Sequence, residues 1–164
     1  MTTKERYEGV LGWFAGKMPV AESELKYNDP FELIVAVILS AQCTDERVNK
    51  VTPALYERFP TLESFAQADP AEVGEYIHSC GFYNGQARDI VACAQQLLQK
   101  HGGKVPGTME ELTALPGVGR KTANLILGDI YHQPAYVCDT HCIRITGRLG
   151  ITDGSKDPVQ VERQ

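Results

Sequence analysis

The stretch LPGVGRKTANLIL, residues 115–127, joins a tight glycine-rich turn to the start of an apolar helix. The preceding segment TMEELTAL, residues 108–115, begins with a Thr-x-x-Glu capping box, so the region predicts helix, turn, helix. Gly117 and Gly119 permit positive φ angles and the close approach of another backbone. The second helix would point unpaired N–H groups out of the turn, which suits an anion such as a DNA phosphate.

Two cations, Arg120 and Lys121, stand at the N-terminus of this second helix. The helix dipole favours anions there, so the pair is locally unfavourable unless it is solvated or faces a negative ligand. A P-loop is excluded, because no strand precedes the turn and the Gly-x-x-x-x-Gly-Lys spacing is absent. Taken alone, the turn fits an ordinary helical hairpin with solvated cations as well as it fits a phosphate site.

Composition predicts a chain with a proper core and no membrane span. The 164 residues are enough for one domain or two small lobes, and 43% of them are apolar. No signal peptide is recognisable, and the longest apolar run, LIVAVIL at 33–39, is too short to cross a bilayer. The sequence therefore predicts a soluble protein of the cytoplasm.

The formal net charge of −5 argues against a polycation that coats nucleic acid. The charge is unevenly spread along the chain. Residues 1–100 carry a net charge of −5, whereas residues 113–152 carry +2. The glycine-rich turn therefore lies in the least acidic part of the chain.

The five cysteines are scattered and include no Cys-x-x-Cys pair, which indicates reduced thiols in a reducing compartment. They are Cys43, Cys80, Cys93, Cys138 and Cys142. The last two lie on either side of His141, but no four-ligand set is recognisable, so the sequence supports no metal site. Cys138 is interpreted either as a small apolar residue or as a cross-linking thiol.

Almost every segment has the apolar spacing or capping signals of an α-helix, and none has a convincing strand pattern, so the predicted class is all-α. The predicted helical segments are residues 5–19, 29–42, 44–59, 69–80, 86–103, 108–115, 120–131 and 139–150. In the segment 29–42, Asp29 as N-cap and Pro30 at the first helical position predict a buried central helix. A buried strand is the alternative for LIVAVIL, but the capping signal and the length favour the helix.

The last residues, DPVQVERQ at 157–164, repeat the Asp-Pro helix start, yet fewer than two turns follow it. So short a helix is marginal by itself. This pattern suggests a chain cut short after Gln164.

Lys121 is followed, 18 residues later, by Asp139 in the segment VCDTHCIR. A neutral lysine amine is a nucleophile, and an ionised carboxylate near it can stabilise a developing cation or carry protons. The pair suits attack on a sugar C1′ with loss of a base. For either residue alone a surface role is the simpler interpretation, and Asp139 could serve only as the N-cap of a helix starting at Thr140.

Four motifs, in order along nearly the whole chain, resemble those of the endonuclease III family within the helix–hairpin–helix superfamily. They are LSAQCTD at 39–45, GFYNGQA at 81–87, LPGVGRKTA at 115–123 and VCDTHCIRITGRLG at 137–150. The resemblance implies a helix–hairpin–helix DNA glycosylase fold, with two helical lobes and the active site in a cleft between them. A barrel lobe would cover residues 22–134, with the hairpin at about 108–131. Residues 1–21 and 135–164 would form the second lobe, incomplete at its C-terminal end.

The same resemblance implies a bifunctional DNA glycosylase and AP lyase of base excision repair. Its substrates would be oxidised or ring-saturated pyrimidines and abasic sites in duplex DNA, processed through a lysine Schiff base and β-elimination. Lys121 matches the nucleophile and Asp139 the catalytic acid, while Asp45 and His141 match positions at the base pocket. The matches to DNA-contacting positions are Gln42, Phe82, Leu115, Gly117, Val118, Gly119, Arg120 and Thr122.

Gln42 and Phe82 match side chains that enter the space left by a flipped nucleotide. Judged without the resemblance, Gln42 is a polar loop residue near a helix end and Phe82 is a core residue. The adenine glycosylases are the nearest related enzymes, but they lack the lysine and use a glutamate in the region occupied here by LSAQCTD. Lys121 therefore favours the lyase-competent branch.

The chain departs from the family in its cysteines. The family usually ends with a Cys-x6-Cys-x2-Cys-x5-Cys loop that holds a [4Fe–4S] cluster, and this chain has no such run. Ligation needs four correctly placed thiolates, so the resemblance implies a cluster that these residues do not support. The alternative function is a catalytically impaired helix–hairpin–helix fragment that binds DNA. The expected partner is damaged double-stranded DNA, with no membrane partner, and the expected state is a monomer.

Overall fold

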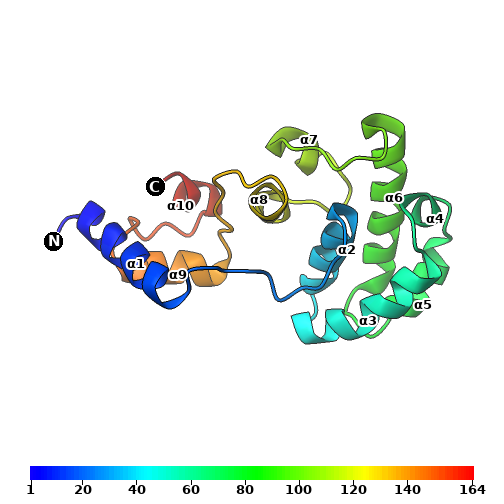
Figure 1. Cartoon of the computed structure of the whole chain (residues 1–164), viewed down its shortest axis with the longest axis horizontal. Coiled ribbons are helices and arrows are strands. Elements are labelled where there is room, and N and C mark those ends of the chain that lie inside the picture. Colours follow the sequence, from blue (N-terminus) through cyan, green and yellow to red (C-terminus); the bar gives the residue numbers. More distant parts are fainter. The chain divides into compact units, whose positions relative to one another are not determined.

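The computed structural model describes all 164 residues as two compact helical units (Figure 1). The smaller unit combines Met1–Glu22 with Ala135–Gln164, and the larger unit is Ser23–Pro134. The chain contains ten helices and no strand, so the predicted all-α class is confirmed. None of the helices is long and apolar enough to cross a membrane.

The larger unit is built around its first helix. Its helices are α2 (Pro30–Ser40), α3 (Asp45–Arg58), α4 (Leu62–Ala66), α5 (Pro70–Ile77), α6 (Tyr83–His101), α7 (Met109–Thr113) and α8 (Arg120–Asp129). All residues of α2 from Leu33 to Leu39 are buried, and α2 packs against α3, α6 and α8. The Asp29 side chain caps α2 by accepting from the Glu32 N–H at 2.9 Å. LIVAVIL is therefore a helix, as the capping signal predicted, and its apolar body forms the centre of the unit.

The longest helix, α6, supplies the second wall of this core. It packs against α4 and α5 as well as α2 (Figure 1). The buried side chains that face these helices include Ala87, Ile90, Val91, Ala94 and Leu97. The helix ends at Gly102, which has a left-handed φ of 59° and stops the helix where the sequence predicted.

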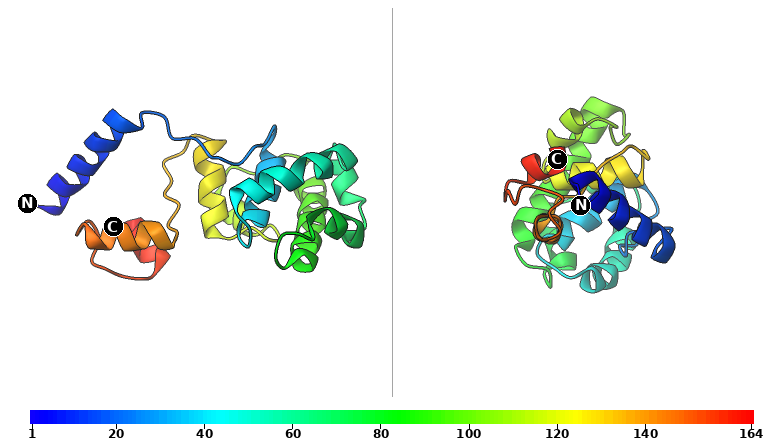
Figure 2. Two further views of the ribbon diagram at one scale, coloured as in Figure 1. Left: turned by 90° about the horizontal axis from the view of Figure 1, so that it is seen from below. Right: turned by 90° about the vertical axis from the view of Figure 1, so that its left-hand side faces the viewer.

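The smaller unit contains α1 (Thr3–Lys17), α9 (Thr140–Arg148) and α10 (Pro158–Arg163). The helices α9 and α10, orange and red in Figures 1 and 2, lie side by side. Arg6 of α1 donates to the Gly150 carbonyl at 3.3 Å, which ties α1 to the end of α9. The buried apolar residues of this unit are only Cys138 and Val161, so its interior is far smaller than that of the larger unit.

Candidate functional site

The helices α7 and α8 form the predicted helix–turn–helix around residues 115–119. The side chains of Leu115 and Val118 point into the core and are buried. The Val118 N–H donates to the Leu115 carbonyl at 3.2 Å, which closes the turn. Both residues match DNA-contacting positions, but their side chains anchor the turn, so a contact with DNA would have to come from their main chain.

Gly117 holds the turn directly against the core. Its φ is +76°, a conformation that side chains rarely adopt, and an added Cβ would lie 3.0 Å from Asp89 Cβ and 3.0 Å from Ile38 Cδ1. The turn therefore rests on α2 and α6, and glycine is required by both the backbone angle and the space. Gly119 is different, because nothing lies within 4 Å of an added Cβ.

The N-terminus of α8 is open to a ligand. No side chain caps it, and its first turn holds no acidic residue. Ala123 is the first residue whose N–H bonds back into the helix, to the Gly119 carbonyl at 2.9 Å. The first amides of a helix have no intrahelical acceptor, and the exposed Lys121 adds a positive charge to this end of α8. Thr122 is half-buried in the same turn.

Gln42 and Phe82 lie on two neighbouring segments of the larger unit. A Cβ built on Gly81, which directly precedes Phe82, would lie 3.5 Å from both Cβ and the carbonyl oxygen of Gln42. The thiols of Cys43 and Cys80 also contact each other, and burial together with this contact raises the pKa of Cys80 to about 12. The structure thus brings together two predicted site residues from distant motifs. No local pattern around Gly81 predicts its contact with Gln42, which only the fold brings about.

Phe82 is not a core residue. Its side chain is 76% exposed, and its backbone is left-handed, with φ 55°. A left-handed bulky residue costs of order 1–3 kcal/mol and commonly marks a functional position. The interpretation of Phe82 as core packing is therefore wrong, because the chain reverses at the N-terminus of α6 and turns the ring outward. Gln42 is exposed as well.

Asp45 is the first residue of α3 and is half-buried. The preceding Thr44 caps this helix, since its side chain accepts from the Arg47 N–H at 3.3 Å. Asp45 thus stands three residues from Gln42, on the helix that follows the same loop.

Asp139 and His141 belong to the smaller unit, where Asp139 is the N-cap of α9. Its Oδ1 accepts from the Cys142 N–H at 2.7 Å. The capping role that the sequence left open is therefore present, and it occupies one of the two carboxylate oxygens. His141 is exposed, and its Nδ1 lies 3.0 Å from the Arg144 guanidinium.

The cysteines do not form a ligand set for a metal or an iron–sulfur cluster. No group of three or more His, Cys, Asp or Glu side chains is arranged to hold a metal ion. Cys43, Cys80 and Cys93 lie in the larger unit and Cys138 and Cys142 in the smaller one, and none is in a disulfide. The residues of this chain therefore do not fit a [4Fe–4S] cluster.

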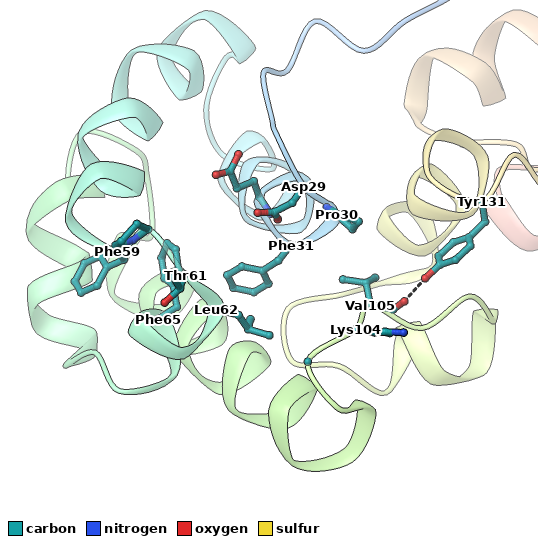
Figure 3. Close-up of a pocket in the computed structure, with 13 residues that line it drawn as sticks. Asp29, Pro30, Phe31, Phe59, Thr61, Leu62, Phe65, Lys104, Val105 and Tyr131 are labelled. Carbon is teal, nitrogen blue, oxygen red and sulfur yellow. Dashed lines mark hydrogen bonds between the residues drawn. The ribbon is translucent and has the colours of Figure 1, made fainter.

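A hollow of about 350 Å³ in the larger unit lies away from these residues (Figure 3). Its lining includes Asp29, Phe31 and Lys104, and the Tyr131 hydroxyl at its edge donates to the Val105 carbonyl. It adjoins the N-terminus of α2 and the residues after α8. Gln42 and Lys121 stand at the opposite ends of these two helices, about 15 Å away along each axis. The hollow is therefore not the candidate site.

Comparison with known proteins assigns these features to one family. The profile described as "HhH-GPD superfamily base excision DNA repair protein" matches residues 35–164. The chain belongs to the HhH-GPD superfamily. The helix–hairpin–helix DNA glycosylase fold predicted from the four motifs is thereby confirmed.

Several members of the HhH-GPD superfamily are close relatives. Endonuclease III of Synechocystis sp. is 45% identical over 161 residues, which are 98% of this chain and 73% of that protein. Endonuclease III of Bacillus subtilis is 39% identical over 99% of this chain and 74% of its own length. The predicted resemblance to endonuclease III is confirmed, and this chain is shorter than these relatives.

Solved structures also match the fold of this chain over most of its length. A trapped endonuclease III–DNA covalent intermediate matches 99% of this chain and 76% of its own, with 40% identity and a TM-score of 0.92. A thermostable thymine-DNA glycosylase matches with a TM-score of 0.82 at 19% identity, which shows a shared fold alone.

Proposed function

We propose that this chain is a DNA glycosylase with AP lyase activity in base excision repair, acting on oxidised or ring-saturated pyrimidines and on abasic sites in duplex DNA. The observation that carries the proposal is the exposed Lys121 in the uncapped first turn of α8, directly after the glycine-rich turn. An amine presented at a phosphate-binding helix end is placed to reach the sugar of a bound nucleotide.

The proposed chemistry uses Lys121 as nucleophile. The neutral Nζ attacks the sugar C1′, a C–N bond forms, and the glycosidic bond breaks as the base leaves with a proton. The amine then gives a proton to the ring oxygen O4′ as the C1′–O4′ bond breaks, so the sugar ring opens and a Schiff base is left at C1′. Loss of a proton from C2′ expels the 3′ phosphate by β-elimination, and water releases the lysine. Asp139 would stabilise the positive charge that grows on the sugar.

The proposed grip on DNA is centred on the hairpin. The main chain at Gly117–Gly119 and the first amides of α8 would hold one phosphate, with help from Arg120. The net charge of −5 offers no broad attraction for a polyanion. The motifs also supply a few cations, Arg120, Lys121, Arg144 and Arg148, for further phosphates. Each neutralised phosphate contributes about 0.9, so we expect a shallow salt dependence, with a slope of log K against log salt of about −2 to −4.

Gln42 and Phe82 would hold the duplex open. Extruding a nucleotide costs a few kcal/mol, and side chains that fill the vacancy offset part of this cost. Both residues are exposed on adjoining segments, as such a role requires. Asp45, three residues after Gln42, and His141 would contact the extruded base.

We test the proposal with three duplexes, which carry a single ring-saturated pyrimidine, a single abasic site or no damage. We expect strand cleavage at the first two and none at the third. Binding of damaged DNA without cleavage would favour the alternative, a catalytically impaired DNA-binding fragment. The presence of both Lys121 and Asp139 supports the enzyme. We also propose that the chain acts as a monomer in the cytoplasm, and size-exclusion chromatography with light scattering tests the monomer.

A further inference from the structure

Gln86, in the first turn of α6, is a polar side chain in an apolar core, with only 8% of its surface exposed. Its Nε2 donates to the Ile38 carbonyl at 3.0 Å. A carbonyl oxygen can only accept, so the amide nitrogen must face Ile38. The other amide atom, Oε1, is buried without a hydrogen-bond partner. A buried acceptor without a partner costs free energy, and this cost offsets the gain from the single side-chain hydrogen bond that Gln86 makes.

The side-chain hydrogen bond of Gln86 satisfies one of the carbonyls at the C-terminus of α2. The last carbonyls of a helix have no intrahelical donor. Here Ser40 Oγ donates to the Val37 carbonyl at 2.9 Å, and the Gln42 N–H bonds to the Leu39 carbonyl at 3.4 Å. The Ile38 carbonyl between them is satisfied by Gln86 instead. A side chain of α6 therefore supplies the hydrogen bond for a carbonyl in the last turn of α2.

The two segments that Gln86 joins each lead to one of the two residues proposed to fill the vacancy in the duplex. These residues, Gln42 and Phe82, are called the wedge residues below. Gln42 follows two residues after the end of α2, and Phe82 directly precedes α6. The Gln86 N–H bonds to the Phe82 carbonyl at 3.2 Å, while its side chain bonds to Ile38. One residue thus joins the segment of Gln42 to the segment of Phe82.

We infer that Gln86 is a positioning residue for nucleotide extrusion, whose amide holds Gln42 and Phe82 at the separation that lets both fill the vacancy in the duplex. The inference rests on the wedge role proposed above for these two residues. Gln86 itself is buried and would touch no DNA. Its loss therefore affects the opening of a base pair and not the bond-breaking step.

The test compares single-turnover rates on a damaged duplex and on the same damaged strand without its complement. Gln86→Met keeps the length of the side chain but removes the donor, and it also removes the unpartnered Oε1. We expect the rate on the duplex to fall about tenfold, the scale of one lost hydrogen bond of 1–1.5 kcal/mol. The rate on the single strand stays within twofold of the wild type.

Gln95→Met is the matched control. Gln95 also lies on α6, and its Nε2 donates to a main-chain carbonyl, that of Ala66, at 3.0 Å. This bond leads to no wedge residue, so the duplex-to-single-strand ratio stays unchanged. Gln86→Glu adds a pH readout, because burial raises the pKa of a carboxyl group and its protonated form can donate to Ile38. Its duplex activity relative to wild type rises as the pH falls, whereas that of Gln86→Met does not.

Gln42→Ala and Phe82→Ala, assayed on both substrates, separate the two claims. If these variants lower the ratio and Gln86→Met does not, the inference about Gln86 is overturned and the wedge proposal stands. If neither of them lowers the ratio, the wedge proposal fails and the inference fails with it. Equal losses on both substrates for Gln86→Met would also overturn the inference.

Discussion

Gly117 in the hairpin and Ile38 in α2 are in direct contact, since a Cβ on Gly117 would lie 3.0 Å from Ile38 Cδ1. Ile38 is also the residue whose carbonyl accepts from Gln86. The last turn of α2 therefore supports the turn that would grip phosphate and the loops that would open the duplex.

Gly117→Ala should destabilise the chain by about 1–3 kcal/mol, because an alanine at φ +76° is strained and its Cβ meets Ile38 and Asp89. Urea unfolding measures the change. Gly119→Ala is the control, since its Cβ meets nothing within 4 Å. Equal losses of stability in the two variants would mean that the contact with Ile38 does not determine the turn.

Phe82→Gly should raise the free energy of unfolding by about 0.5–1 kcal/mol. Glycine relieves the left-handed strain at φ 55°, and this gain exceeds the cost that comes from the greater conformational entropy of glycine in the unfolded chain. The same variant should cleave damaged duplex more slowly, since the exposed ring is gone. Phe82→Ala keeps the strained backbone and should lose activity without gaining stability. A Phe82→Gly variant that is less stable than the wild type would show that the ring stabilises the fold.

Asp139→Asn should lower the single-turnover rate about 10²-fold or more, the scale of a lost charge or acid–base group. Asparagine is as good an N-cap as aspartate, so the bond to the Cys142 N–H is kept and stability should change little. Asp139→Ala removes the cap as well and should cost about 1 kcal/mol of stability. A rate unchanged in Asp139→Asn and lowered only in Asp139→Ala would make Asp139 a structural cap alone.

Stability should fall at alkaline pH because of the buried thiols. Burial raises the pKa of Cys93 to about 12 from an ordinary value near 9. Above pH 9 the folded chain keeps the thiol proton of Cys93 while the unfolded chain loses it. The contribution of Cys93 to the free energy of unfolding is therefore complete below pH 9 and is lost as the pH rises from 9 towards 12. Cys93→Ala should show a shallower decline of unfolding free energy between pH 8 and pH 10.5. Parallel declines would show that Cys93 ionises as easily in the folded chain as in the unfolded one.

Local signals predicted much of the fold and the hairpin. The Asp29–Pro30 start and the apolar run that follows it indicated a central helix, and α2 is that helix. The glycine-rich turn between two helical patterns indicated a hairpin, and the spacing alone gave its limits to within a few residues. These features depend on capping, backbone freedom and apolar periodicity, which are properties of neighbouring residues.

The remaining features depend on contacts between distant parts of the chain. Without the family resemblance, nothing in the motif GFYNGQA indicates that Phe82 points outward. Nothing in it indicates that Gln86 reaches the Ile38 carbonyl, 48 residues away. The hairpin motif identified Leu115 and Val118, but it did not indicate that their side chains are buried in the core. Packing decides which atoms of a motif remain available to a ligand, and local patterns do not contain that information.

The central claim is that Lys121 forms a Schiff base with C1′ of the target nucleotide. The most direct measurement is borohydride trapping on abasic duplex DNA, with the wild type, Lys121→Ala and Lys104→Ala, an exposed lysine away from the hairpin. We predict a covalent protein–DNA adduct in the wild type and in Lys104→Ala, linked to the peptide that contains residue 121. We predict none in Lys121→Ala. A trapped adduct of undiminished yield in Lys121→Ala would contradict the account.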